Sequence, residues 1–139
     1  IELVRLLGRS DTRTIAGAWA RAHLPTDAVV VSWGTPGQVA NFGAPNLGAI
    51  RVYPGLPPTQ WDALGVTHVI RHAYPLPWSG VALPPETAGR LRPLVSFSPF
   101  DGPTADPILE PLDAFYLPLA HFTGVVRPGP AIDVFEVMR

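Results

Sequence analysis

The two histidines of the segment THVIRHAY, His68 and His72, come nearest to a metal-binding pair in type and spacing. Zinc ligands must converge on one ion at about 2 Å each. Residues four apart on a strand share a face but lie about 13 Å from each other, which is too far for one ion. No carboxylate or third histidine lies nearby in the sequence to complete a site. We interpret both histidines as structural or surface residues and predict no metal site.

The glycines of SWGTPGQ, Gly34 and Gly37, lie where a phosphate-binding loop would lie, between an expected strand and a possible helix. A dinucleotide fingerprint needs the full glycine spacing and an acidic residue about 20 positions further on, and a nucleoside-triphosphate loop needs Gly-Lys-Ser/Thr. Neither pattern is present, and the chain contains no lysine. We interpret this segment as a turn and predict no cofactor.

Hydroxyl and carboxylate groups give no catalytic pattern. A serine nucleophile needs a sharp turn such as Gly-x-Ser-x-Gly, which the chain lacks. The serines that lie in expected strands or loops without such a turn are Ser32, Ser79, Ser96 and Ser98. The aspartates that could be acid or base groups are Asp101, Asp106 and Asp113, but the composition FDGPTADP is typical of turns and explains the first two. The sequence predicts no catalytic residue.

A ligand, if one binds, is expected at the carboxyl ends of parallel strands, where crevices form in α/β sheets. Trp33 and Gly34 end the first expected strand, and Arg71, His72 and Tyr74 end the second. Aromatic faces beside an arginine suit a sugar or a phosphate-bearing headgroup. The alternative interpretation is that these residues pack beneath the loops.

The elements that would position these residues begin with an amphipathic helix. Ser10 or Asp11 can cap it, and Pro25 ends it because the residue before a proline is disfavoured in a helix. The expected apolar stripe consists of Ile15, Ala18, Trp19 and Ala22. The run AVVVSW follows and is typical of a buried strand.

Further helix–strand units repeat this pattern. One helix is expected from Pro57 or Pro58 to Leu64, with a strand over residues 66–72. The next unit places a short helix at 86–91 and a strand at 94–97, and the final strand spans 131–138. Weaker signals suggest helical turns at 38–42 and a strand at 49–53.

Repeated helix–strand units predict a single compact α/β domain over residues 1–139, with a mostly parallel sheet flanked by helices. The last two strands are not joined by a convincing crossover helix. We therefore expect them to form an antiparallel C-terminal edge pair.

An aromatic segment precedes the last strand in DAFYLPLAHFTGVVRPGPAIDVFEV. Arg127-Pro128-Gly129-Pro130 is typical of a type II turn, in which glycine supplies the positive φ. Residues 115–122 before it are too apolar for a free loop, so we expect them to cover the sheet or to dock on a neighbouring surface. Tyr116 and Arg127 join the candidate binding residues.

Composition limits the function classes. Hydrophobic residues make up 47% of the 139 residues and charged residues 15%, so the chain can bury a real core. The formal net charge of −1 predicts no nucleic-acid partner. Cysteine is absent, and the chain opens IELVRLL without methionine, as if cut from a longer protein.

Four segments together resemble a known family. They are DTRTIAGAWARAHLPTDAVVV, LGVTHVIRHAY, LVSFSPF and RPGPAIDVFEV. This pattern is similar to the C-terminal extracytoplasmic domain of bacterial polytopic glycosyltransferases, the membrane proteins related to protein O-mannosyltransferases and lipid A aminoarabinose transferases. His68 stands where that family usually has an aromatic residue.

The resemblance implies that the parent protein transfers a sugar from a polyprenyl-phosphate donor at the periplasmic face of the inner membrane. The family's catalytic carboxylates lie between its membrane helices, so none is carried onto this sequence. This domain would then be a non-catalytic accessory whose partners are the membrane portion of its own chain and a polyprenyl-phosphate sugar or glycan acceptor. The rival hypothesis is a free-standing α/β ligand-binding or protein-interaction module.

Overall fold

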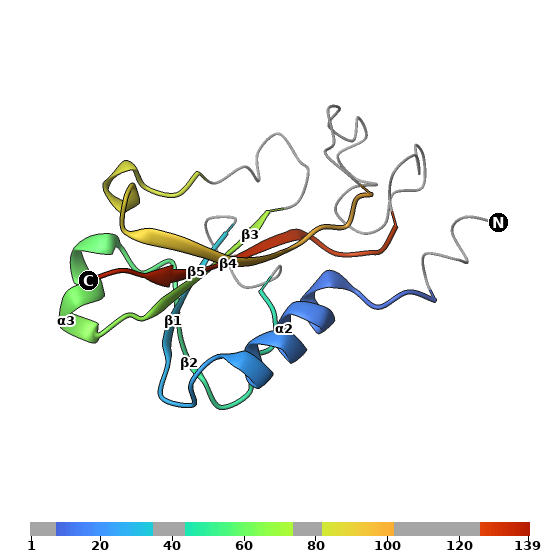
Figure 1. The fold of residues 1–139 in the computed structure, drawn as a ribbon, viewed down its shortest axis with the longest axis horizontal. Coiled ribbons are helices and arrows are strands. Elements are labelled where there is room, and N and C mark those ends of the chain that lie inside the picture. Colours follow the sequence, from blue (N-terminus) through green and yellow to red (C-terminus); the bar gives the residue numbers. More distant parts are fainter. Residues whose placement is uncertain (1–7, 35–43, 74–81, 102–125) are drawn as a thin grey trace.

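A computed structural model describes residues 8–34, 44–73, 82–101 and 126–139, and its centre is one five-stranded sheet (Figure 1). The strands are β1 (Val29–Trp33), β2 (Arg51–Pro54), β3 (His68–Ala73), β4 (Leu91–Phe97) and β5 (Ala131–Val137), in the spatial order β2-β1-β3-β5-β4. The helical turns expected at 38–42 and the aromatic segment at 115–122 lie outside the described residues.

The strand directions make the sheet mixed. β1 pairs in parallel with both β2 and β3, whereas β5 pairs antiparallel with β3 and with β4. The predicted α/β class, with a mostly parallel sheet and an antiparallel C-terminal pair, is confirmed. Within that pair β4 forms the outer edge, and the later strand β5 lies inside the sheet.

Helix α2 (Thr12–His23) begins and ends where its sequence predicts. Of the two possible caps, Asp11 is the one used: its Oδ1 accepts a hydrogen bond of 2.8 Å from the backbone amide of Arg13. The helix ends at Leu24, directly before Pro25. One face of α2 packs against β4 and β5.

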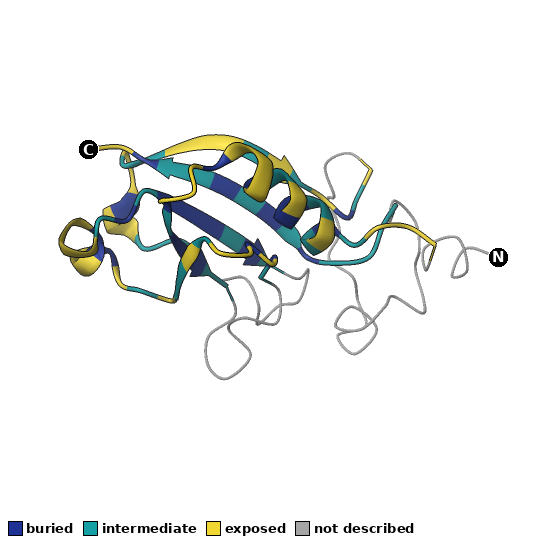
Figure 2. Cartoon of the chain, turned by 90° about the horizontal axis from the view of Figure 1, so that it is seen from below, coloured by how far each residue is buried: buried dark blue, intermediate teal, exposed yellow. Residues whose placement is uncertain are grey.

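The buried face of α2 is not the predicted one. Its buried residues are Thr12, Ala16, Gly17 and Ala20, and Figure 2 shows exposed residues on the opposite side of the helix. Ala18 and Ala22, which the pattern assigned to the core, are exposed. Small residues allow the closer approach, because a Cβ added to Gly17 would lie 2.7 Å from the carbonyl oxygen of Asn46.

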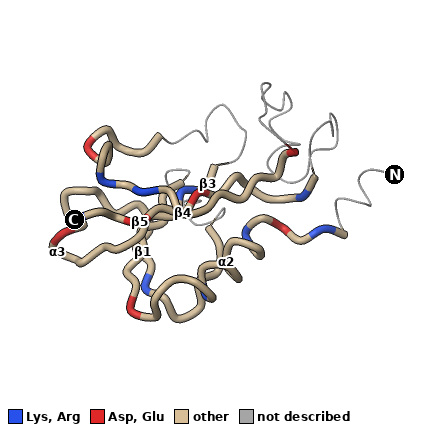
Figure 3. The backbone as a smooth tube through the Cα atoms, in the orientation of Figure 1, with Lys and Arg blue, Asp and Glu red and all other residues tan. Residues whose placement is uncertain are grey.

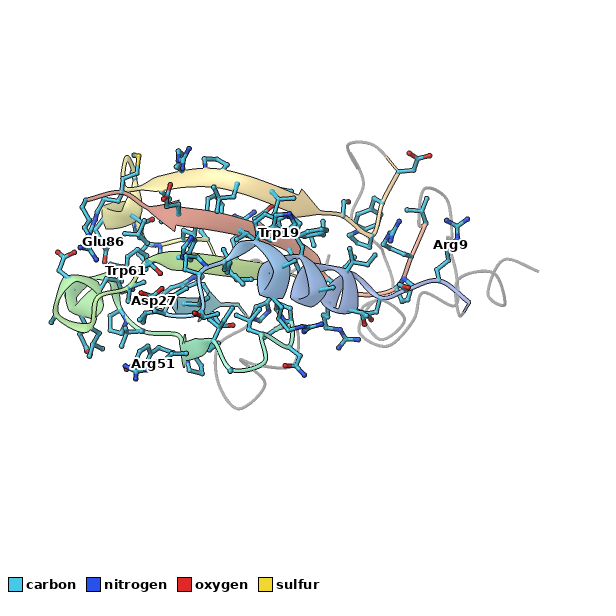
Figure 4. The ribbon with its side chains drawn as sticks, turned by 60° about the horizontal axis from the view of Figure 1, so that its bottom comes forward. Arg9, Trp19, Asp27, Arg51, Trp61 and Glu86 are labelled. Atoms are coloured by element: carbon cyan, nitrogen blue, oxygen red, sulfur yellow. The ribbon has the colours of Figure 1, made fainter. Side chains whose placement is uncertain are left out.

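Trp19 is too large for that close interface and lies at its margin (Figure 4). Its ring stacks on His23 at 4.7 Å and meets Phe97 of β4 edge-on at 6.3 Å. The large aromatic residue therefore closes the side of the interface, while small residues form its centre.

The second helical unit is short. A 3-10 turn at Pro58–Gln60 runs into α3 (Trp61–Leu64), which ends at Gly65 in a left-handed conformation with φ 67°. Trp61 is completely buried, and its Nε1 donates a 2.8 Å hydrogen bond to the carbonyl of Leu56. The helix predicted from Pro57 or Pro58 to Leu64 is present in this form.

The third predicted helix, at 86–91, is reduced to a 3-10 turn at Pro85–Thr87. Gly89 has a φ of 77°, which interrupts helical geometry. The chain then joins the sheet early, because the carbonyl of Arg90 accepts a 2.7 Å hydrogen bond from the amide of Met138. As a result β4 begins at Leu91, three residues before the expected start.

The sheet separates two apolar clusters. The cluster under α2 includes Val30 of β1 and Ile70 of β3, whereas Val31 and Val69 face Trp61 on the opposite side. Ile132 and Val134 of β5 are also fully buried under α2. Burying such a side chain contributes about 1.5 to 3 kcal/mol, so β5 is a core element.

Hydrogen bonds connect the turn before β5 to the start of α2. The amide of Thr12 donates a 3.0 Å hydrogen bond to the carbonyl of Pro128, and its Oγ1 donates one of 2.7 Å to Pro130. Gly129 has a φ of 107°, in agreement with the expected positive value. A Cβ at Gly129 would lie 2.2 Å from Thr12 Oγ1, so the turn and the helix meet backbone to backbone.

Candidate functional site

The candidate residues of β1 and β3 meet at the carboxyl ends of these parallel strands. The register places Trp33 beside Arg71. Because side chains alternate along a strand, these two share one face of the sheet, and their neighbours Ser32 and His72 lie on the face that α2 covers. The described parts of the chain that precede residues 35–43 and 74–81 end here as well, at Gly34 and Ala73.

On the face away from α2, four side chains form a line across four adjacent strands. Trp33 of β1 lies beside Arg71 of β3, which lies opposite Asp133 of β5, which lies opposite Ser96 of β4. We call this set the carboxyl-end row. Sequence reasoning found Trp33 and Arg71 but missed Asp133 and Ser96.

Hydrogen bonds join three members of the carboxyl-end row. Arg71 donates from Nε at 3.1 Å and from Nη2 at 2.8 Å to the same carboxylate oxygen, Oδ2 of Asp133. The other oxygen, Oδ1, accepts a 2.7 Å hydrogen bond from Ser96 Oγ. Both carboxylate oxygens therefore have partners from neighbouring strands, and the pairing ties β3, β5 and β4 together.

The row is only partly covered. The side chains of Arg71 and Asp133 keep 38% and 23% of their surface exposed. Trp33 is half-buried, and its indole Nε1 donates a 3.3 Å hydrogen bond to the carbonyl of Ala82. These side chains are held in place while their polar groups still reach the surface.

On the opposite face, a buried hydroxyl meets a buried imidazole. Ser32 Oγ lies 3.2 Å from His72 Nε2, and the two residues are 4% and 1% exposed. Gly34 allows this arrangement, because a Cβ there would lie 1.9 Å from Cε1 of His72. Neither strand sequence indicated this contact, which depends on the register between β1 and β3. At this depth the pair stabilises the packing and is out of reach of a substrate.

A second polar line crosses the sheet at its other end, on the α2 face. It consists of His68 of β3, Glu136 of β5 and Arg92 of β4, paired in register, and we call it the amino-end row. Arg92 donates to Glu136 Oε2 from Nε at 2.8 Å and also from Nη2. His68 Nδ1 lies 2.8 Å from Thr67 Oγ1. Burial lowers the pKa of His68 below its usual value, and Glu136 opposes that shift only in part.

One pocket adjoins the amino-end row, and a second shares Val137, Met138 and Arg139 with it. The first, of about 560 Å³, is lined by His68, Arg92 and Glu136 together with Asp27 and Arg139. The second, of about 750 Å³, has Trp61, Asp62 and Arg90 in its wall. Both pockets have side chains of both signs in their walls. Figure 3 shows positive and negative residues interspersed along the described chain.

Of the remaining candidates, the structure describes Arg127. Arg127 is in the turn before β5, where its amide donates a 3.4 Å hydrogen bond to Pro99. Tyr74 and Tyr116 lie outside the described residues. His68 and His72 face separate partners at different depths along β3, as the strand spacing predicts.

Comparison of the chain with family models, with curated proteins and with solved structures finds no match. Within the four described ranges, no three histidine, cysteine, aspartate or glutamate residues gather in a way that could hold a metal ion. None of the helices in the described part of the chain combines the length and hydropathy needed to cross a membrane. The geometry of the carboxyl-end row and the sequence pattern are the features that bear on function.

Proposed function

We propose that this chain is a non-catalytic accessory domain of a membrane glycosyltransferase, one that transfers a lipid-linked sugar to an acceptor at the periplasmic face of the inner membrane. The four segments that resemble that family contain the main helix and residues of four of the five strands. They supply α2 with β1, then β3, then β4, and finally the turn with β5. The sequence pattern thus coincides with the elements that build the sheet and its edge.

One observation favours binding over catalysis: the negative charge of the Asp133 carboxylate is paired with Arg71 at 2.8 Å. The two oxygens of this carboxylate accept hydrogen bonds from Arg71 and Ser96. A general acid or base must instead be within hydrogen-bond reach of a substrate proton. The histidine at this end of the sheet, His72, is 1% exposed. In this proposal the carboxyl-end row contacts a ligand, and the chemistry takes place in the membrane portion of the parent chain.

The test of this proposal is the size and location of the native polypeptide. An antibody raised to the 139-residue chain would be used on fractionated cells and on protease-treated spheroplasts. A large membrane-bound band that external protease cleaves is the expected result. A soluble band near 14.9 kDa would overturn the proposal and favour a free-standing ligand-binding or interaction module.

A further inference from the structure

We propose that the carboxyl-end row, Trp33, Arg71, Asp133 and Ser96, binds uncharged sugar residues of a glycan, and not the phosphate of a lipid-linked sugar donor. This inference rests on the proposed function and narrows it, because it assigns the row to the acceptor. The juxtaposition that carries it is an aromatic side chain in line with a charge-neutral set of hydrogen-bonding groups.

The shape of the row suits an extended ligand. Its side chains project from four neighbouring strands, and strands in a sheet lie about 4.8 Å apart, so the groups follow one another at regular steps. The row lies on one face of the sheet, and the side chains of Arg71 and Asp133 are partly exposed. A chain of sugar rings can lie along such a surface and meet several groups in succession.

The chemical groups also fit a sugar. Two of the five N–H groups of Arg71 bond Asp133, and the others can donate to a sugar hydroxyl. The Ser96 hydroxyl donates its proton to Asp133, so its oxygen and the remaining lone pairs of the carboxylate can act only as acceptors. A sugar ring presents hydroxyls that donate and accept, together with an apolar C–H surface. Trp33 lies next to Arg71 and supplies an aromatic surface whose polar edge is already fixed by Ala82.

Charge discriminates between the two possible ligands of a lipid-linked transferase. Phosphate sites use arginines whose charge is available to the anion. Here the guanidinium of Arg71 is already paired with Asp133 at 2.8 Å. A phosphate bound to Arg71 would also lie close to the Asp133 carboxylate, and the two negative charges would repel each other. Uncharged hydroxyls incur no such repulsion.

The direct test is a titration of the ¹⁵N-labelled 139-residue chain with mannohexaose, maltohexaose and arabinohexaose, and separately with mannose 1-phosphate, observed by NMR. We expect at least one neutral oligosaccharide to shift the indole N–H signal of Trp33 and the amides around Arg71 and Asp133. Mannose 1-phosphate should leave these signals in place. Shifts with the phosphate alone, or no shifts with any of the three oligosaccharides, would overturn the inference.

Two substitutions separate the roles of hydroxyl and charge. Ser96→Ala removes one exposed hydroxyl and should weaken the neutral sugar by about 3- to 10-fold, the usual effect of one hydrogen bond. Asp133→Asn keeps the shape but leaves Arg71 without its countercharge, so the sugar should bind more weakly and mannose 1-phosphate should now bind. Unchanged ligand preference in Asp133→Asn would contradict the argument from charge.

Arg92→Gln is the matched control, since it removes another arginine–carboxylate pair of β5, with β4 in place of β3, at the other end of the sheet. It should leave sugar binding unchanged. If the unsubstituted chain binds no sugar, the role of the carboxyl-end row is overturned, whereas the result of the membrane fractionation still stands. A small soluble native polypeptide would overturn the accessory-domain proposal and leave any measured sugar binding intact.

Discussion

Apolar clusters lie on both faces of the sheet, but the close packing at two glycines on the α2 side and the carboxyl-end row on the other side depend on different kinds of contact. Under α2 the chain meets itself at van der Waals distance, and a Cβ on Gly34 or Gly129 would lie within about 2 Å of a neighbour, at 1.9 and 2.2 Å respectively. On the other face, Arg71, Asp133 and Ser96 are joined by directional hydrogen bonds and stay partly exposed. Added volume should therefore be the costly change at Gly34 and Gly129, whereas loss of a polar partner should be the costly change in the carboxyl-end row.

The largest expected effect is on the α2 face, at the turn before β5. Gly129→Ala forces a side chain into a φ of 107° and against Thr12, and should lower the free energy of unfolding by about 2 to 5 kcal/mol. Urea denaturation measures the change. Gly55→Ala is the control, because Gly55 has a φ of 63° but nothing within 4 Å of an added Cβ. Equal losses in the two variants would show that close packing contributes nothing at Gly129.

A smaller loss is expected where β1 meets His72. Gly34→Ala should cost about 1 to 3 kcal/mol of unfolding free energy, because the added carbon displaces the imidazole from Ser32. In a His72→Ala background the same substitution should cost close to nothing, since the obstructing ring is gone. A double-mutant cycle by urea denaturation measures this coupling. Additive losses would contradict the contact.

In the carboxyl-end row, the loss of a hydrogen-bonded partner should determine the change in unfolding free energy. Arg71→Gln should lower the unfolding free energy by about 1 to 2 kcal/mol, because it breaks two hydrogen bonds to a carboxylate that is mostly buried. Arg92→Gln removes a pair whose side chains are 60% and 39% exposed, and should cost less than about 1 kcal/mol. If the urea denaturation midpoints of Arg71→Gln and Arg92→Gln fall equally, the Arg71–Asp133 pair contributes no more stability than an exposed surface pair.

The smallest effect expected is a pH dependence from the amino-end row. Burial lowers the pKa of His68 below its usual 6.5, so the unfolded chain takes up a proton first as the pH falls. The contribution of neutral His68 to stability is complete above the pKa of the unfolded chain. It is lost as the pH falls from about 6.5 toward the lower pKa of the folded chain. His68→Gln should flatten the thermal midpoint between pH 7.5 and 5.5. An unchanged slope in that variant would exclude His68 as its source.

Asp11 acts in a separate, more acidic window. Burial raises the pKa of this carboxyl, but hydrogen bonds from the side chain and the amide of Arg13 outweigh it, and the net pKa lies below the usual 3.8. Its contribution to stability is therefore present above about 3.8 and is lost as the pH falls through the folded pKa. Measurements above pH 5 isolate His68 from this group.

The strands and their directions could largely be predicted from the sequence, because apolar β-branched runs mark β1 and β3 and alternation marks β5. The position of β5 between β3 and β4 could not. Strand order depends on contacts far apart in the chain, and local patterns carry no information about them. The helix stripe failed for a related reason: Trp19 and Ile15 are the most apolar residues of α2, but packing distance selects Ala16, Gly17 and Ala20.

The candidate site was half predictable. Trp33 and Arg71 follow from the rule that ligands bind at the carboxyl ends of parallel strands. Asp133 and Ser96 could not be found, because Arg71 lies 62 residues from Asp133 in the chain and Ser96 lies 37 residues from it. A bulge between Pro93 and Val95 also shifts the register of β4, so counting along the strand would have misplaced Ser96.

The interior position of β5 has a consequence for how the molecule folds. Until residues 131–137 have left the ribosome, β3 and β4 each expose an edge with no partner, and the pair that will flank β5 is not yet joined. Among the described strands β4 pairs only with β5, so β5 must pair with β3 on one side and β4 on the other. The pairing with β3 closes a long loop, which costs chain entropy before any contact compensates it. Such non-local pairing is slow, and the unpaired edges are open to other chains in the meantime. Completion of the described sheet therefore depends on β5, which follows the other four strands in the chain.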